Sequence, residues 1–232
     1  MSKVCAILGV GPGNGEAFVR RFSEEGFQVA MLARSESYLL DLEAAIPGAS
    51  AFLCDLMQPE QITSVLAAIE SKLGPVSVLL YNAGGGTFKT VEQASLEDFE
   101  ANWRINVQGL VAATKAALPQ LRQHKMASIV VTSASAATRG RANTAPFASA
   151  KAAQRSLAQS LARQLGPEKI HVANVVIDGV VDLPRTREML PDKPDDFFVQ
   201  PSAVAEAVWS LCQQNPSAWT HELDIRPFGE SW

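Results

Sequence analysis

The chain has 232 residues, of which 47% are hydrophobic and 19% are charged, and its formal net charge is −4. A chain of this length and composition can bury one large core, so we expect a single domain over residues 1–232. The slight negative charge gives no electrostatic reason to expect nucleic acid or an anionic membrane as a partner.

The N-terminal apolar run, residues 3–8, is short and leads directly into glycines. A signal peptide needs a longer apolar stretch and a cleavage site, and a membrane span needs roughly 18 apolar residues in succession. Cys5, Cys54 and Cys212 stand in apolar contexts without metal-ligand spacing. They indicate buried thiols in a reducing compartment, so the sequence predicts a cytoplasmic protein with no metal site.

Short apolar runs rich in β-formers alternate along the chain with segments whose apolar residues recur at helical spacing. This alternation is typical of βαβ units with right-handed crossovers. The sequence therefore predicts an α/β fold, a single Rossmann-type doubly wound parallel sheet of about seven strands with helices on both faces. The expected strands cover residues 4–8, 27–33, 50–54, 76–81, 128–132, 171–177 and 223–225.

The segment 182–201 differs from the rest, because it holds four prolines and several charges without a clean period. We interpret it as a flap inserted into the domain. Its larger apolar side chains either close over a ligand crevice as a lid or pack against a helix. These side chains are Met189, Leu190, Phe197 and Phe198.

The first predicted strand ends in a glycine-rich turn, residues 9–15, and a helical pattern follows. Glycines let a backbone turn tightly and approach a pyrophosphate, which binds to the amide groups at the helix N-terminus. The strand before the turn and the helix after it make a dinucleotide site the expected interpretation. Its predicted residues are Gly9, Gly11, Gly13, Asn14 and Gly15.

The end of the second strand bears on which dinucleotide binds. NAD sites usually offer a carboxylate to the ribose 2′-hydroxyl there, whereas NADP sites carry an arginine. This strand ends in Arg34 and Ser35, with no acid before Glu36. A guanidinium with paired donors suits a 2′-phosphate, so we expect NADP rather than NAD. The alternative is that Arg34 is a surface arginine without a ligand.

Residues 147–151 resemble the Tyr-x-x-x-Lys motif of the short-chain dehydrogenase/reductase family, but Phe147 stands where the family has tyrosine. Positions i and i+4 share a helix face, so the family's phenol and Lys151 would meet. The glycine spacing of residues 9–15 also resembles the family's form. The resemblance covers essentially the whole chain and implies an oxidoreductase that uses a nicotinamide cofactor.

The resemblance also implies cofactor contacts beyond the glycine turn. The carboxylate of Asp55 would accept from the adenine amino group, and residues 82–84 resemble the family's Asn-Asn-Ala-Gly turn with Tyr81 replacing the first asparagine. After strand six, Gly179 matches the family's Pro-Gly. The residues implied as cofactor-binding are Asp55, Leu56, Asn82, Ala83, Gly84, Lys151, Gly179 and Val180.

The family's catalytic set is kept only in part. Asn106 and Lys151 match it, and the resemblance implies that Lys151 holds the nicotinamide ribose while Asn106 helps anchor a water chain behind the lysine. The usual serine position falls on Ala134, so Ser133 is the nearest substitute. Phe147 replaces the acid and supplies no proton.

Further departures surround this set. Asp178 and Leu183 replace the proline and threonine that the family carries after strand six. Tyr81 is the other possible acid, although family analogy puts it on the adenosine side. Arg139 and Arg141 either accept a substrate carboxylate or phosphate or remain solvated.

Two functional hypotheses follow. The first is an NADP-dependent oxidoreductase that transfers hydride between NADPH and a small carbonyl or conjugated enone or enoyl substrate, with an atypical proton donor. The second is a catalytically silent NADPH-binding sensor or regulatory subunit. Residues 219–227 form an expected edge strand, which needs covering, and family relatives pack this region across a twofold interface. We therefore expect a homodimer or homotetramer.

Overall fold

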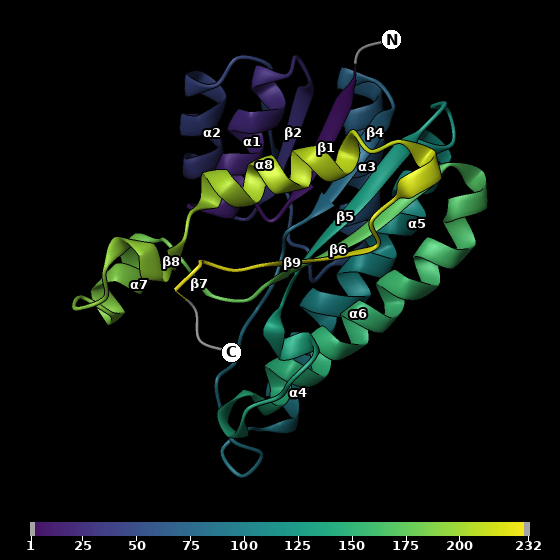
Figure 1. The fold of residues 1–232 in the computed structure, drawn as a ribbon. Coiled ribbons are helices and arrows are strands. Elements are labelled where there is room, and N and C mark those ends of the chain that lie inside the picture. Colours follow the sequence, from purple (N-terminus) through teal and green to yellow (C-terminus); the bar gives the residue numbers. More distant parts are fainter. Residues whose placement is uncertain (1–2, 230–232) are drawn as a thin grey trace.

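The protein is described from a computed structural model that covers residues 3–229; residues 1–2 and 230–232 of the predicted domain lie outside the described residues. Its centre is a parallel sheet with the strand order β3-β2-β1-β4-β5-β6-β9 (Figure 1). The predicted fold class is therefore confirmed. The strands are β1 (Val4–Leu8), β2 (Gln28–Ala33), β3 (Ala49–Leu53), β4 (Val76–Tyr81), β5 (Ala127–Ala134), β6 (Ile170–Ile177) and β9 (Glu222–Ile225).

Helices connect these strands. They are α1 (Asn14–Glu24), α2 (Glu36–Ala45), α3 (Pro59–Leu73), α4 (Leu96–Trp103), α5 (Gly109–Leu121), α6 (Ala145–Leu165), α7 (Pro184–Met189) and α8 (Pro201–Cys212). A π-helical turn, η1 (Arg104–Gln108), joins α4 to α5. Short 3-10 turns cover Ser135–Ala137, Ala142–Thr144, Gly166–Glu168, Asp195–Phe197 and Pro216–Ala218.

Each face of the sheet has its own core, because successive strand side chains point to opposite faces. Leu8 packs in the core that α3, α5 and α6 cover. Its neighbour Ile7 packs in the core that α1, α2 and α8 cover. The covering helices bury both faces, which is why the parallel strands are almost continuously apolar in sequence.

The chain reverses its direction of travel across the sheet at β1, which pairs with β2 on one side and β4 on the other. In a doubly wound sheet this switch point opens a crevice at the carboxyl ends of the strands. The glycine turn, Arg34, Asp55 and Asn82 each follow one of these strand ends. The topology therefore gathers them at one edge.

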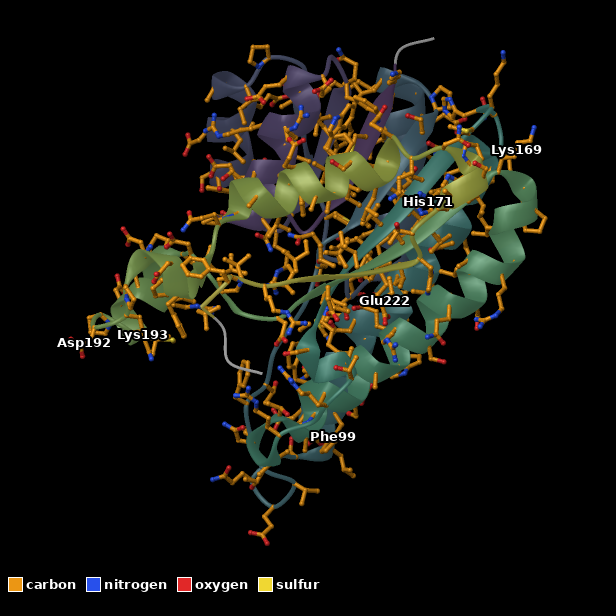
Figure 2. The ribbon with its side chains drawn as sticks, viewed as in Figure 1. Phe99, Lys169, His171, Asp192, Lys193 and Glu222 are labelled. Carbon is orange, nitrogen blue, oxygen red and sulfur yellow. The ribbon has the colours of Figure 1, made fainter. Side chains whose placement is uncertain are left out.

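The flap has more internal structure than the sequence predicted. Two short strands, β7 (Val180–Val181) and β8 (Phe198–Val199), pair in parallel and close its base. Between them, Arg187 bonds to Asp182 and Asp195. The outer end of the flap, at Asp192 and Lys193, projects away from the central sheet (Figure 2).

The flap's apolar side chains differ in exposure. Phe198 is only 3% exposed and pairs with Val180 of β7, while Met189 is 68% exposed. Phe197 packs edge-on against Phe198. The two phenylalanines therefore pack against each other, and closure of the flap over the crevice stays a prediction.

The remaining bulk predictions are tested only in part. No helix within residues 3–229 combines the length and apolarity that crossing a bilayer requires. Cys5 and Cys54 are buried and Cys212 is partly buried, and all three thiols are free. In the described part of the chain, no cluster of three or more His, Cys, Asp or Glu side chains could hold a metal. The cytoplasmic location stays a prediction.

Candidate functional site

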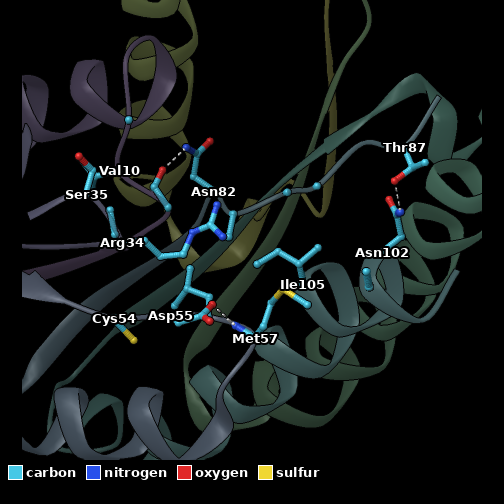
Figure 3. Close-up of a pocket in the computed structure, with 18 residues that line it drawn as sticks. Val10, Arg34, Ser35, Cys54, Asp55, Met57, Asn82, Thr87, Asn102 and Ile105 are labelled. Carbon is cyan, nitrogen blue, oxygen red and sulfur yellow. Dashed lines mark hydrogen bonds between the residues drawn. The ribbon is translucent and has the colours of Figure 1, made fainter. Parts of the chain in front are cut away.

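A cavity of about 470 Å³ lies at the carboxyl ends of β1, β2, β3 and β4. Arg34, Asp55 and Asn82 converge on it from three different strand ends (Figure 3). Further residues come from the loop after β4, from α4 and from η1. The predicted site residues that line it are Gly9, Gly11, Arg34, Ser35, Asp55, Leu56, Asn82, Ala83 and Gly84.

The glycine turn passes directly over the end of β4. Gly9 has a φ of 95°, and a Cβ added there would lie 2.6 Å from the backbone nitrogen of Ala83. The Asn82 side chain donates to the Gly9 carbonyl at 2.8 Å, which fixes the two strand ends together. A side chain at position 9 would clash with the backbone of Ala83, so the turn needs glycine.

Gly13, Asn14 and Gly15 belong to the N-terminus of α1 rather than to the cavity lining. A Cβ added at Gly13 would lie 2.2 Å from Leu183 Cδ2, so the root of the flap covers this position. Asn14 begins α1, and its buried Oδ1 has no hydrogen-bond partner among residues 3–229. Gly15 is buried in the first turn of the helix.

Arg34 and Ser35 stand at the rim of the cavity. Both are exposed, and Arg34 has no ion-pair partner in the described part of the chain. Ser35 is the N-cap of α2, but its hydroxyl makes no capping bond. A free guanidinium and a free hydroxyl beside a helix N-terminus favour an anion electrostatically.

Asp55 stabilises the turn after β3. Its Oδ1 accepts from the Met57 amide at 3.0 Å, and its own amide donates to Gln61 at 2.9 Å. The residue is partly exposed and lines the cavity. One carboxylate oxygen therefore bonds within the turn. Because the residue also lines the cavity, its carboxylate is available to a ligand.

Lys151 projects from α6 into the protein and is 5% exposed. Its Nζ donates to the Thr132 carbonyl at 3.1 Å and to Gln154 Oε1 at 2.9 Å. Burial lowers the pKa of Lys151 to about 7, because removal from water disfavours the charged form. A Cβ at Gly84 would lie 3.5 Å from Nζ, so the ammonium borders the backbone that lines the cavity.

Asn106 lies in the π-helical turn η1 and is completely buried. Its Nδ2 donates to the carbonyls of Gly85 and Asn102, while its Oδ1 has no partner among residues 3–229. Its backbone carbonyl accepts from Gln154 Nε2 at 2.6 Å. The Gln154 side chain therefore links the Asn106 backbone to Lys151, and the water chain that the resemblance implies stays a prediction.

The sequence motif did not predict Gln154, because the family motif ends at the lysine. The signal was available in the spacing, since a residue three positions after Lys151 shares its helix face. A polar residue at such a core-facing position in an otherwise apolar helix stripe would have indicated a partner.

Phe147 lies one helical turn before Lys151 and packs its ring against Phe88, with 5.6 Å between the ring centroids. Ser133 is buried on β5, and its Oγ has no partner in the described part of the chain. Alternation along β5 puts Ser133 on the same sheet face as Val131, which packs in the core that α6 covers. Ser133, Phe147 and Lys151 therefore lie on one side of the sheet.

Asp178, which replaces the family's proline after strand six, is the centre of an ion-pair cluster. Arg139 donates to both carboxylate oxygens of Asp178, at 2.8 and 3.0 Å, and Arg226 lies 3.6 Å from the same carboxylate. Arg139 is therefore engaged within the protein, while Arg141 is exposed. Gly179 follows Asp178 directly, and Val180 begins β7.

Tyr81 does not qualify as the alternative acid. Its side chain is completely buried, and its hydroxyl donates to the Ile105 carbonyl. Burial raises the pKa of this phenol well above its ordinary value. The residue packs in the core and does not line the cavity.

Comparison with known proteins agrees with this geometry. A family model for short chain dehydrogenases matches residues 3–193. The 3-oxoacyl-(acyl-carrier-protein) reductase of Thermotoga maritima is 28% identical over 234 residues, with 95% of this chain and 94% of that protein covered.

Solved structures agree as well. A short-chain dehydrogenase from Rhodopseudomonas palustris is 30% identical with a TM-score of 0.84, and the match covers 97% of this chain and 99% of that one. An alcohol dehydrogenase from Thermococcus sibiricus, complexed with 5-hydroxy-NADP, is 25% identical with a TM-score of 0.85 and coverage of 100% and 99%. The chain therefore belongs to the short chain dehydrogenase family, which confirms the predicted oxidoreductase class.

Proposed function

We propose that the protein is an NADPH-dependent reductase that acts on a small carbonyl compound or on a conjugated enone or enoyl substrate. The observation that carries this proposal is the crevice itself: one continuous backbone, at Gly84, borders both the cavity and the Lys151 ammonium. The cavity suits the adenosine of the cofactor, and the Lys151 ammonium suits the hydroxyls of the nicotinamide ribose. The 3-oxoacyl reductase of T. maritima supports a carbonyl substrate.

The choice of NADP over NAD rests on Arg34. Its guanidinium is exposed at the cavity rim and has no ion-pair partner among residues 3–229, so it is free to bind a 2′-phosphate bidentately. Ser35 adds a free hydroxyl at the N-terminus of α2. The complex of the T. sibiricus relative with 5-hydroxy-NADP supports this assignment.

The remaining cofactor contacts are assigned by position. The amides of Gly11, Gly13, Asn14 and Gly15 would bind the pyrophosphate, and the unpartnered buried oxygen of Asn14 fits a polar ligand at this end of α1. Asp55 would accept from the adenine amino group, with Leu56 beside it. Gly179 and Val180, at the root of the flap, would lie against the nicotinamide.

NADPH would supply a hydride, which forms the new C–H bond while the cofactor becomes NADP⁺. A carbonyl substrate then needs one proton on its oxygen, and Phe147 has none to give. Ser133 or a water molecule held by Lys151 would donate it. For a conjugated double bond the hydride adds to the β-carbon, and protonation of the α-carbon follows. Loss of a general acid typically costs about 10²–10⁴ in rate. We expect reduction of a conjugated double bond to be less affected than reduction of a carbonyl, because its protonation follows the hydride addition.

Assembly is a separate part of the proposal. Leu96 and Trp103 on α4 and Val111 on α5 are exposed apolar side chains, at 83%, 48% and 37%. Large apolar side chains exposed to solvent on neighbouring helices support an interface with a second copy of the chain. We therefore propose a homodimer or homotetramer, and light scattering of the purified protein would test this. We also propose that the protein is cytoplasmic.

The first experiment follows NADPH absorbance with ketones, aldehydes, quinones and enoyl thioesters. Lys151→Ala is the test variant, and Lys115→Ala, an exposed lysine on α5, is the matched control. We expect turnover that disappears in Lys151→Ala and persists in Lys115→Ala. Turnover that survives in Lys151→Ala would refute the assigned site.

A second candidate function, an NADPH-binding sensor or regulatory subunit, is favoured by one observation. Phe147 stands where the resemblance implies the catalytic phenol, and its ring packs against Phe88. A sensor must bind one oxidation state more tightly, because equal affinity shifts no equilibrium. Silence across the substrate panel together with unequal affinities for NADPH and NADP⁺ would favour this function; equal affinities would exclude it.

A further inference from the structure

Gln154 is a buried glutamine on α6, and its exposed fraction is 0%. Its Oε1 accepts from Lys151 Nζ at 2.9 Å, and its Nε2 donates to the Asn106 carbonyl at 2.6 Å. The reverse amide orientation would turn an NH₂ group towards the ammonium and an oxygen towards a carbonyl, which leaves both pairs unbonded. The two neighbours therefore fix the orientation of the amide.

The amide connects two parts of the site that come from different elements. Lys151 lies on α6, whereas Asn106 lies in the π-helical turn η1, and such turns are frequent at functional sites. An ammonium has three donors. Thr132 and Gln154 accept two of them, and the ammonium borders Gly84 at the inner edge of the cavity.

We propose that Gln154 is a positioning residue, which holds the Lys151 ammonium between the Thr132 carbonyl and the backbone of Asn106 and so directs its third donor to the cofactor ribose. The inference rests on the proposed NADPH site. Gln154 also fills the space between the ammonium and the Asn106 carbonyl with a group that does not titrate, unlike a carboxylate.

The surroundings of Lys151 make its hydrogen bond to Gln154 important. Burial lowers its pKa, and no charged side chain offsets that effect. The oxygen of Gln154 is a dipole that favours the charged form of the lysine. Arg141 and Glu97 are exposed. The other ionisable side chains on the surrounding elements bond elsewhere: Tyr81 to the Ile105 carbonyl, Arg104 to Glu100, Asp98 to Lys89, Arg139 to Asp178, Arg155 to Glu222, Arg163 to the Gln159 carbonyl and His171 to the Thr220 carbonyl.

The test uses two substitutions with opposite expected signs. Gln154→Glu puts a carboxylate beside the ammonium, and Gln154→Met keeps the length of the side chain but removes the acceptor. The readout is the pKa of Lys151, measured by NMR titration of protein labelled with ¹³C at lysine Cε and assigned with Lys151→Ala. We expect Gln154→Glu to raise this pKa by about 1–3 and Gln154→Met to lower it.

Gln120 provides a matched control. It is also a buried glutamine that bridges two groups, because its Oε1 accepts from the Val76 amide at 3.1 Å and its Nε2 donates to the Leu66 carbonyl at 3.0 Å. Gln120→Glu and Gln120→Met should lower thermal stability and leave the Lys151 titration unchanged. A Lys151 titration that does not move in Gln154→Glu would overturn the proposal, even if Gln154→Met fails to fold.

NADPH titrations of the same proteins separate this inference from the proposed function. In the wild type, NADPH affinity should fall as pH rises through the pKa of Lys151, and the midpoint should move with that pKa in each Gln154 variant. NADPH binding whose pH midpoint ignores the Gln154 substitutions refutes the positioning role alone. A wild type that binds no NADPH, with the NMR shifts present, refutes the proposed function and leaves the contact of Gln154 with Lys151 established.

Discussion

The two halves of the crevice differ in how closely they keep the family pattern. On the adenosine side, the glycine turn, Asp55 and Asn82 all stand where the resemblance placed them, and they meet around one cavity. On the proposed nicotinamide side, Phe147 stands where the resemblance implies a phenol, and Asp178 holds Arg139 in an ion pair.

We infer from this difference that cofactor binding and chemistry depend on separate residues. The proposed adenosine side is built largely from backbone at strand ends, so its shape follows from the sheet and from a few glycines. The proposed nicotinamide side depends on individual side chains of α6, β5 and the flap. A single substitution there should change the chemistry and leave the cavity intact.

Restoring the phenol should produce the largest effect. Phe147→Tyr would put a hydroxyl one helical turn before Lys151, where the ammonium favours its ionised form. We expect turnover of simple ketones or aldehydes to rise by about 10²-fold or more, because that is the usual contribution of a general acid. Initial rates of NADPH oxidation would measure it.

Phe88→Tyr is the matched control for that substitution, because Phe88 packs against Phe147 but lies on a different element from Lys151. It adds the same hydroxyl without the helical spacing, so its rates should stay near those of the wild type. If Phe147→Tyr gives no increase while it still binds NADPH, the missing proton is not what limits the reaction.

The sequence predicted the sheet and most of the adenosine side, because strands and glycine turns follow from local patterns. The strand bounds differ by up to two residues, and β7 and β8 were missed because two-residue strands have no period. The spacing from Lys151 puts Gln154 on the same helix face, but it does not reveal the partner of its amide. The pair of Arg139 with Asp178 likewise depends on tertiary neighbours.

Substitutions on the proposed adenosine side should destabilise the protein through backbone strain rather than through lost side-chain contacts. Gly9→Ala would place a Cβ 2.6 Å from the Ala83 nitrogen at a φ of 95°. We expect a loss of about 2–4 kcal/mol in the free energy of unfolding, from overpacking and from a strained backbone. Chemical denaturation would measure it. Gly166→Ala is the control, since nothing lies within 4 Å of a Cβ there; equal losses in both variants would contradict the close approach.

Arg34 is the exception on the proposed adenosine side, because we propose that its side chain selects NADP over NAD. Arg34→Ala should weaken NADPH binding about 10- to 100-fold, since charge-assisted hydrogen bonds are worth about 1.5–3 kcal/mol. NADH binding should hardly change, because NADH lacks the 2′-phosphate. Fluorescence titration with both cofactors measures the ratio, and a parallel loss of both affinities would exclude a 2′-phosphate contact.

The smallest effect is expected in the flap, where the interactions are mostly exposed. Hydrogen bonds from Arg187 lower the pKa of Asp182 from its ordinary value of 3.8 to about 2. A lowered carboxyl pKa stabilises the folded flap above pH 3.8, and this contribution is lost as pH falls through about 2.

At neutral pH, Arg187→Ala removes the partner of both Asp182 and Asp195, whereas Arg185→Ala, on the same short helix, removes an exposed side chain with no ion pair among residues 3–229. Hydrogen exchange of the flap amides should therefore accelerate a few-fold in Arg187→Ala and stay unchanged in Arg185→Ala. Because β7 and β8 still close the base of the flap, the faster exchange should stop at Val181 and Phe198. Exchange that spreads into β6 would mean that the flap and the sheet unfold as one unit, so that the nicotinamide side would be no more separable from the core than the adenosine side.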